Sequence, residues 1–461
     1  MIKKLLSSQL RINMVSGVAA TIINTIVLAI GYPIFLHYLD YELYGVWLLL
    51  STVLTFARLG NLGIGQAVMK LVAEEYGRKD IKGIQQYIIT ALAMICLSGF
   101  AVLVALLLLE KPIVTAFRLS GENSDIFSGL LPYIGMLSIF AFVVDILQGT
   151  LSGLGRMDIT NYIQVAGRTI QILVACILLI LGIGIKSMLV GYIASYLFIY
   201  LSLIFCIKQK ISVKIFDLHN LEIKKCRKLL SFGGNIFASS ILNMLFNPFN
   251  KLMLSRYGGV AVVPIYEIAY SGSMQVRALF EVALKSLMPE ISKLNSNLTM
   301  QARNRIHKIN HLVMKIIFIM GIPTYGILAL FSPFLFKIWL KEEFVVALPN
   351  VFRVMLFGTY LSLLGVPAYY LLLGLGQVRR NLESYIIQTM VNLIIIITSI
   401  LFISSASLYI VIFATTIGMG ASTAYLIWQR QIALKNICFE NNTISISNDM
   451  SNSLFCKSGS Y

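Results

Sequence analysis

The sequence predicts an all-α polytopic membrane protein with twelve transmembrane helices in two parallel six-helix bundles around a central cavity. Three observations lead to this class: an apolar composition, long uninterrupted apolar runs, and motifs that recur in both halves. Of the 461 residues, 58% are hydrophobic and only 12% are charged, with a mean hydropathy of +0.83. A soluble protein of this size needs more charge to cover its surface, so soluble enzymes, secreted disulfide scaffolds and disordered chains are excluded.

The apolar residues form continuous runs rather than the alternating pattern of a membrane β-barrel. The run 88–109 is typical, since it approaches the roughly 20 residues that a spanning helix needs. In chain order, the expected spans are 13–35, 44–66, 85–109, 127–149, 160–183, 187–207, 232–255, 265–287, 309–332, 349–373, 383–403 and 408–429.

The distribution of basic residues predicts the orientation. The segments that share a side with the N-terminus carry most of the 37 Lys and Arg residues. Cytoplasmic loops of membrane proteins are enriched in these residues, so both termini are predicted to be cytoplasmic. The formal net charge of +17 follows from this bias and does not indicate nucleic acid binding.

Neither a disulfide nor a metal site is predicted. The six cysteines fall in spans or on the reducing side of the membrane. His307 and His311 are four residues apart, but Lys308 stands where a zinc-binding helix carries Glu. We therefore expect no metal and no cofactor.

Two motifs recur at similar offsets in the two halves. Leu131-Pro132 opens one span, which is followed by Gly-Leu-Gly-Arg at 153–156; Leu348-Pro349 opens another, which is followed by Gly-Leu-Gly-Gln at 374–377. A short polar turn and helix restart at 39–47 parallels 257–268. Six spans per half is an even number, so the two halves share one orientation, which favours alternating access over a simple pore.

The repeat gives the predicted domain organisation. An N-terminal bundle covers 1–207, a basic cytoplasmic linker 208–230, and a C-terminal bundle 231–435. The segment 436–461 is rich in Asn and Ser and is predicted to be a disordered cytoplasmic tail.

Several of these motifs resemble those of the multidrug/oligosaccharidyl-lipid/polysaccharide (MOP) exporter superfamily. Within it, the chain is similar to the polysaccharide-transporter branch of Wzx-type O-antigen flippases. The resemblance rests on Leu-Tyr-Gly-Val-Trp at 43–47, on 61–80, on the two Gly-Leu-Gly turns, and on Ser-Leu-Met-Pro-Glu at 286–290. One departure is Asn61, where relatives commonly carry an acidic residue.

The resemblance implies a flippase for undecaprenyl-pyrophosphate-linked oligosaccharide repeat units of O-antigen or capsule type. It also implies a location in the bacterial cytoplasmic (inner) membrane and contact with membrane lipid. Candidate partners that follow from it are a coupling proton or sodium ion, a glycan polymerase and a chain-length regulator.

Ionisable residues within the spans are the candidate substrate-binding residues. Each costs about 2.5–3.5 kcal/mol at a lipid-facing position, so such residues are expected to face a cavity or a partner. Arg277, Glu281 and Lys285 form one helical stripe, and Arg58 and Arg168 lie in other spans. Together they predict a cationic cavity that attracts pyrophosphate and acidic sugars.

Internal pairing is the alternative for these charges. The stripe residues can pair with one another, and Asp145 can pair with either Arg58 or Arg168. Arg58 can also extend its charge to the membrane surface, and Arg168 can lie near the cytoplasmic interface.

Span 232–255 carries a candidate hinge. Pro248 removes a backbone donor, which predicts a kink, and Asn247 beside it is a candidate sugar-binding amide. The alternative is a helix contact stabilised by Asn side chains.

Two competing functions remain open at the sequence level. A drug/cation antiporter of the same superfamily requires a membrane-embedded acid, whereas the spans are biased toward Arg and Lys. An O-antigen polymerase is expected to keep a substantial outer loop, whereas the longest outer connections expected here are 110–126 and 333–348, neither of which contains His. The chain is therefore predicted not to be an enzyme.

Overall fold

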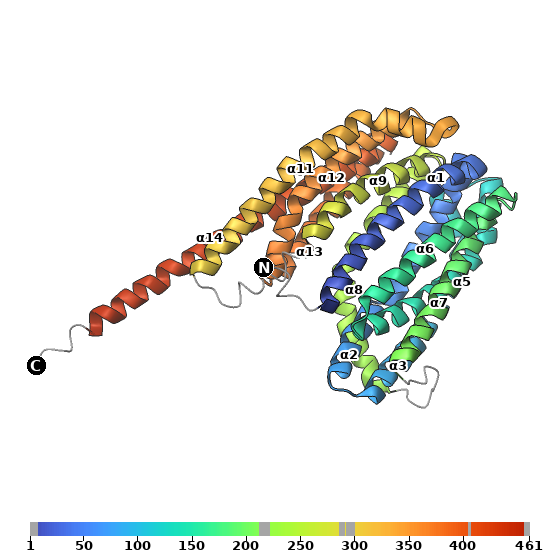
Figure 1. Cartoon of the computed structure of the whole chain (residues 1–461). Coiled ribbons are helices and arrows are strands. Elements are labelled where there is room, and N and C mark those ends of the chain that lie inside the picture. Colours follow the sequence, from blue (N-terminus) through green and yellow to red (C-terminus); the bar gives the residue numbers. More distant parts are fainter. Residues whose placement is uncertain (1–7, 212–221, 285–290, 292–299, 404–406, 456–461) are drawn as a thin grey trace, which may run out of the picture. The chain divides into compact units, whose positions relative to one another are not determined.

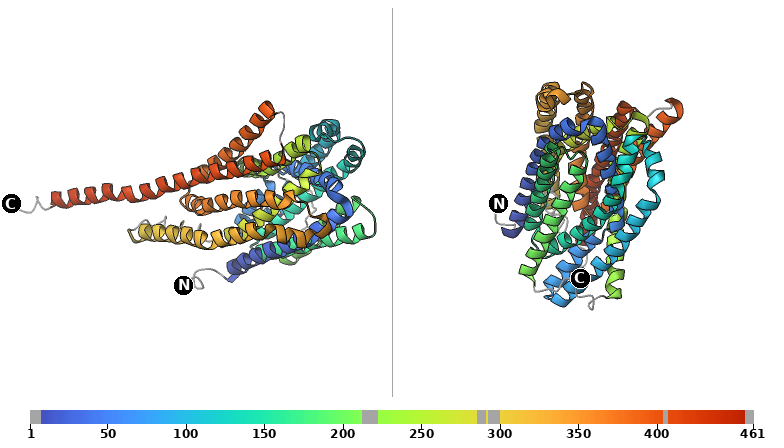
Figure 2. Two further views of the ribbon diagram at one scale, coloured as in Figure 1. Left: turned by 90° about the horizontal axis from the view of Figure 1, so that it is seen from above. Right: turned by 90° about the vertical axis from the view of Figure 1, so that its right-hand side faces the viewer.

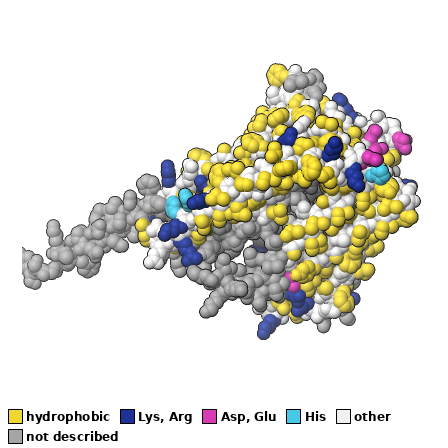
Figure 3. Space-filling view, turned by 45° about the horizontal axis from the view of Figure 1, so that its top comes forward, with side chains coloured by type: hydrophobic (Ala, Val, Ile, Leu, Met, Phe, Trp, Pro, Cys, Tyr) yellow, Lys and Arg dark blue, Asp and Glu magenta, His cyan; other side chains and the backbone are white. Residues whose placement is uncertain are grey.

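The computed structural model describes residues 8–211, 222–284, 291, 300–403 and 407–455. Within these residues the regular structure is helical and includes no β-strand (Figure 1). Nine of the described helices are long and apolar enough to cross a membrane. Hydrophobic side chains also dominate the face drawn in Figure 3. The predicted all-α membrane fold is thus confirmed, while the count of twelve spans stays a prediction.

The helices group into two compact units. Unit 1 comprises Met1–Ser271, Leu335–Leu348 and Ser399–Val411, and unit 2 comprises Gly272–Phe334, Pro349–Thr398 and Ile412–Tyr461. The predicted linker 208–230 includes residues 212–221, which lie outside the described residues. The predicted domain boundaries therefore stay a prediction.

Unit 1 contains the helices of the first half of the chain. Within it, α5 packs on α1, α2, α3 and α7, while α6 packs on α1 and α7 (Figures 1 and 2). Its elements are α1 (Ser8–Ala57), η2 (Arg58–Asn61), α2 (Ile64–Gly77), α3 (Ile81–Leu108), α4 (Glu110–Phe117), α5 (Glu122–Gly153), α6 (Met157–Ile180), α7 (Lys186–Lys210), α8 (Ile223–Gly258), the start of α9 (Val262–Leu284), the end of α11 (Met300–Leu340) and η4 (Lys341–Glu343).

Unit 2 contains the rest of α9, α11 up to Phe334, and most of the last three helices. These are α12 (Ala347–Gly374), α13 (Val378–Ile403) and α14 (Leu408–Phe455). Helix α14 extends into the segment for which we expected a disordered tail (Figure 2). The sequence has no Gly or Pro between Ala421 and Phe455, and an existing helix gains one hydrogen bond for each residue that it adds.

The first expected span and the start of the second lie in α1, which is kinked within the turn expected at 39–47. Asp40 leaves the helical conformation with φ 56°. Its carboxylate accepts hydrogen bonds from the backbone N–H groups of Glu42 (2.8 Å) and Leu43 (2.9 Å). Asp40 thereby caps the second part of α1 as an N-cap residue does.

The two Gly-Leu-Gly turns have the same backbone geometry. Gly155 follows α5 with φ +81°, and Gly376 follows α12 with φ +79°. Each glycine N–H donates to the carbonyl three residues earlier, Ser152 in one turn (2.9 Å) and Leu373 in the other (3.1 Å). The sequence repeat therefore corresponds to a repeated left-handed helix end, which only glycine adopts without strain.

Candidate functional site

The candidate site lies in unit 1, where the chain breaks between α1 and α2. After the short helix η2, Leu62 (φ 50°) and Gly63 (φ 70°) both take the left-handed conformation before α2 starts. For Leu62 this conformation costs about 1–2 kcal/mol. The break turns Arg58 and Asn61 out of the regular helix and toward α5.

An acidic residue of α5 meets these two side chains. Asn61 Nδ2 donates to Asp145 Oδ2 at 2.8 Å. Arg58 Nη2 lies 3.8 Å from Asp145 Oδ1, and the two side chains are 44% and 27% exposed. On its other side, Arg58 interacts with the hydroxyl of Tyr196 on α7. Of the two predicted partners for Asp145, the structure brings Arg58 to it.

Glycines let α2 and α5 approach closely enough for this contact. A Cβ on Gly149 would lie 2.3 Å from the carbonyl oxygen of Gly65, and one on Gly153 would lie 2.6 Å from that of Met69. The two α5 glycines are four residues apart, which is the Gly-x-x-x-Gly spacing of close helix pairs in membranes. This packing sets the position of Asp145, one turn before Gly149.

A cavity of about 430 Å³ opens beside the Arg58–Asp145 pair. Its lining has one basic and one acidic side chain, Arg58 and Asp145, so the cavity carries no net charge. The other polar groups are neutral: five amides and two hydroxyls from α2, α5, α6 and the break, namely Asn61, Gln66, Gln148, Asn161, Gln164, Ser152 and Thr160.

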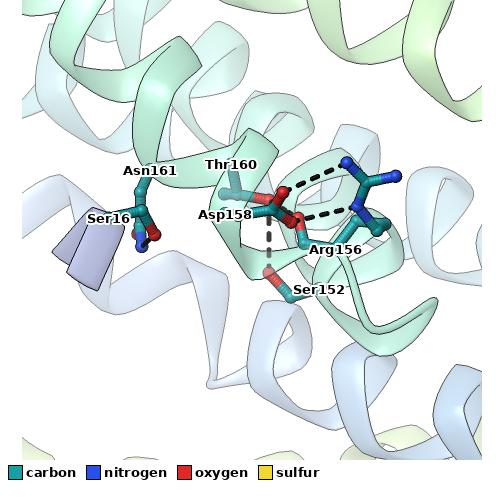
Figure 4. A network of polar contacts seen from close by, with 6 residues as sticks. All are labelled: Ser16, Ser152, Arg156, Asp158, Thr160 and Asn161. Atoms are coloured by element: carbon teal, nitrogen blue, oxygen red, sulfur yellow. Dashed lines mark hydrogen bonds and ion pairs between the residues drawn. The ribbon is translucent and has the colours of Figure 1, made fainter. Parts of the chain in front are cut away.

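Part of this lining is fixed by hydrogen bonds between helices. Gln164 Nε2 donates to Gln148 Oε1 at 2.8 Å, which links α6 to α5. Asn161 Nδ2 donates to Ser16 Oγ at 3.0 Å, which links α6 to α1 (Figure 4). The amides at the cavity thus have defined positions while they retain further donors and acceptors for a ligand.

The α5–α6 turn next to the cavity carries a bidentate ion pair. Arg156 donates through Nε (3.0 Å) and Nη2 (3.1 Å) to the two carboxylate oxygens of Asp158 (Figure 4). This hydrogen bonding raises the pKa of Arg156 above its ordinary value. Ser152 Oγ and Thr160 Oγ1 lie 3.4 Å apart across the same turn. The turn holds the ends of α5 and α6 at a fixed spacing.

Arg168 lies on the cavity-facing side of α6, one turn beyond Gln164, but it does not line the cavity. Its Nη1 donates to Gln171 Oε1 at 3.4 Å. Asn247 is half-buried on α8, and its Oδ1 has no hydrogen-bond partner within the described part of the chain. Pro248 is buried, and α8 continues through it as one helix. The structure does not bring these residues to the cavity, and the hinge stays a prediction.

Unit 2 holds the remaining predicted pair. Arg277 Nη2 lies 3.5 Å from Glu281 Oε2 on α9, and Tyr370 Oη donates to Glu281 Oε1 at 3.3 Å. The predicted internal pairing thus occurs between Arg277 and Glu281. Lys285 lies outside the described residues.

Sequence reasoning missed most of the lining. The cavity amides were not predicted because the candidate site residues in the spans were identified mainly by their charge, and neutral amides are also common where membrane helices contact one another. Their spacing is a usable signal, since Asn161 and Gln164 lie three residues apart and share one face of α6.

Comparisons with known proteins agree with this architecture. The model of the family described as "Polysaccharide biosynthesis protein" matches residues 10–295. No curated protein matches the sequence.

Among solved structures, three transporters illustrate the shared fold. An inward-facing multidrug resistance MATE family transporter of the MOP superfamily superposes with a TM-score of 0.75 at 15% identity, over 94% of this chain and 96% of that one. An outward-facing transporter of the same family gives 0.61 at 15%, over 92% and 96%. A MOP superfamily transporter from Pyrococcus furiosus, described as having a binding pocket of reverse polarity, gives 0.62 at 16%, over 92% and 96%.

These identities are low and show the fold alone, whereas the family model covers more than half of the chain. The chain therefore belongs to the polysaccharide biosynthesis protein family, and its fold is similar to that of MOP superfamily transporters.

Proposed function

We propose that this chain exports undecaprenyl-pyrophosphate-linked oligosaccharide repeat units across the bacterial cytoplasmic membrane by alternating access. Both termini are cytoplasmic in this proposal, and a proton or sodium gradient drives the cycle. Membership of a polysaccharide biosynthesis family supports a glycan substrate. The observation that carries the proposal is the unit 1 cavity, whose lining combines neutral amides with one arginine and one aspartate.

The chemistry of this lining suits a glycan joined to phosphate. Sugar hydroxyls both donate and accept hydrogen bonds, and the side chains of Gln66, Gln148 and Gln164 offer both kinds of group. A guanidinium binds phosphate oxygens bidentately. Arg58 and Asp145 are 3.8 Å apart, which is longer than a direct hydrogen bond, so a pyrophosphate can compete for the guanidinium.

A drug/cation antiporter is the second candidate, because Asp145 supplies a membrane-embedded acid that such carriers need. Asn61 already donates to this carboxylate at 2.8 Å and the positive charge of Arg58 lies beside it, which disfavours a cationic ligand there. The two functions differ in which cavity residue is essential: Arg58 for an anionic ligand, Asp145 for a cationic one.

The test follows lipid-linked repeat units in a deletion strain that carries wild-type or variant protein. Arg58→Ala is expected to lower surface glycan roughly tenfold or more and to leave complete repeat units on the inner leaflet, because a hydrogen bond to a charged group contributes about 1.5–3 kcal/mol. Arg78→Ala is the matched control, since Arg78 is 70% exposed and pairs with Glu75 away from the cavity.

The outcomes separate the competing functions. An unchanged lipid-linked pool in the deletion strain would refute glycan export and favour the antiporter. Repeat units that reach the outer leaflet but are not polymerised would indicate a polymerase instead.

A further inference from the structure

We propose that residues 335–343 form a strap that holds α1 in the observed conformation and releases it by swinging about Pro333 during the transport cycle. The strap is the last part of α11 together with η4, and it belongs to unit 1 with α1. The inference concerns the conformational cycle and holds whichever substrate is carried.

The strap is anchored at a carbonyl that a proline leaves free. Pro33 lies inside α1 and has no N–H, so the carbonyl of Ala29, four residues earlier, loses its helical partner. Trp339 of the strap donates its indole Nε1–H to this carbonyl at 2.6 Å. In a membrane an unpaired carbonyl costs several kcal/mol, so this site accepts a donor readily.

Further contacts hold the strap along the same stretch of α1. Tyr41 Oη donates to the backbone carbonyl of Glu343 at 2.7 Å, and His37 Nδ1 lies 3.3 Å from the Glu343 carboxylate. The rings of Tyr32 and Trp339 meet edge to face, with centroids 6.1 Å apart. The polar contacts use side chains of α1 or the strap, so they can break without unravelling either helix.

The pivot in α11 also contains a proline that leaves a backbone carbonyl without its helical donor. Pro333 leaves the carbonyl of Ala329 without a helical partner. Arg353 Nε donates to this carbonyl at 2.9 Å, and Ser332 Oγ does so at 2.9 Å. Since side chains replace the backbone bond, α11 can bend here while the carbonyl stays satisfied.

The division of the chain supports a pivot at this point. Helix α11 belongs to unit 2 up to Phe334 and to unit 1 from Leu335 onward. The change of unit therefore falls next to Pro333.

A reversible cross-link tests whether the strap must detach. In a variant without native cysteines, His37→Cys with Glu343→Cys can be joined by a thiol-reactive cross-linker that contains a cleavable disulfide, because the two side-chain ends meet at 3.3 Å while a direct disulfide requires closer Cβ atoms. Cross-linking is expected to reduce export at least tenfold, and cleavage of the linker by a reducing agent to restore it. Glu42→Cys with Asn123→Cys is the matched control, because these exposed side chains also touch (2.6 Å) but join α1 to α5 without the strap. Export at the uncrosslinked rate from cross-linked His37→Cys/Glu343→Cys protein would overturn the proposal.

A second measurement needs no substrate. Trp47→Phe and Trp428→Phe leave Trp339 as the sole tryptophan of the three. Pro33→Ala restores an N–H that competes for the Ala29 carbonyl and is expected to loosen the strap about two- to tenfold, the range of one ordinary hydrogen bond. Quenching of Trp339 fluorescence by acrylamide should rise accordingly. Unchanged quenching would show that the hydrogen bond from the Trp339 indole to Ala29 does not hold the strap. This conclusion does not depend on which substrate the protein exports.

Discussion

The glycine contact between α2 and α5 gives the sharpest test of the cavity geometry. In Gly149→Ala the new methyl group would lie 2.3 Å from the carbonyl oxygen of Gly65, which belongs to helix backbone and cannot rotate away. Restoring ordinary contact requires the two helices to separate by roughly 1 Å. Because Asp145 lies one turn from Gly149, the separation also pulls its carboxylate away from Asn61, with which it makes a 2.8 Å hydrogen bond.

The expected magnitude follows from two opposing terms. Overpacking costs about 1–3 kcal/mol, and replacing glycine by alanine within a helix returns about 0.5–1 kcal/mol. Gly129→Ala is the matched control because Gly129 is an exposed glycine of the same helix whose added Cβ meets nothing within 4 Å. It should show only the favourable term, so the two variants should differ in unfolding free energy by about 1–3 kcal/mol.

Thermal unfolding of the detergent-purified variants measures this difference, and surface glycan display measures export. We expect Gly149→Ala to unfold at a lower temperature than wild type and to export less, and Gly129→Ala to match or exceed wild type in both. Equal stability and equal export from the two variants would refute the inferred contact and the role of α2–α5 packing in the cavity.

Two further predictions concern other features of the fold. Gly155→Ala and Gly376→Ala should each destabilise the protein by about 1–2 kcal/mol, because alanine is strained at φ +81° and +79°. Gly326→Ala is the control, since Gly326 is an exposed helical glycine with open space around it. A loss of stability in only one of the two turn variants would contradict the structural repeat. Lys251→Met should cost about 3–5 kcal/mol, because it leaves Glu267 without its partner at 2.9 Å in a buried site. Lys251→Met/Glu267→Gln should recover most of this loss, and an equally unstable double variant would show that the charge is not the cause.

Much of the fold follows from the sequence because lipid imposes a simple rule. Continuous apolar runs must become helices, and the two Gly-Leu-Gly turns identified as a repeat do share one backbone geometry. The polar turn and helix restart expected at 39–47 correspond to the kink of α1, where Asp40 leaves the helical conformation and caps the second part. The continuation of α14 to Phe455 was not predicted, because the Asn- and Ser-rich composition of 436–461 indicates only that few side chains are buried there. Whether a helix continues depends instead on the backbone hydrogen bonds that each added residue forms.

The site was predictable only in part. Arg58 stands out as a charge in an apolar span, and its pairing with Asp145 was one of two open alternatives. That the carboxylate facing Asn61 comes from α5 was not predicted, since this depends on the close approach of α2 and α5. The spacing of Gly149 and Gly153 contains that information, because small residues four apart mark close helix pairs. Among the cavity amides, the three-residue spacing of Asn161 and Gln164 is the corresponding signal.

Reconstituted flipping in proteoliposomes tests glycan export by this protein without other cell components. Purified protein in proteoliposomes that contain an undecaprenyl-pyrophosphate-linked oligosaccharide, with an ion gradient imposed, should move the glycan from one leaflet to the other, as measured by its accessibility to an externally added glycosidase. We predict rapid transfer by wild type and the Arg78→Ala control, and transfer slowed roughly tenfold or more by Arg58→Ala. Transfer no faster than in protein-free liposomes, or equal transfer by the two arginine variants, would contradict the account.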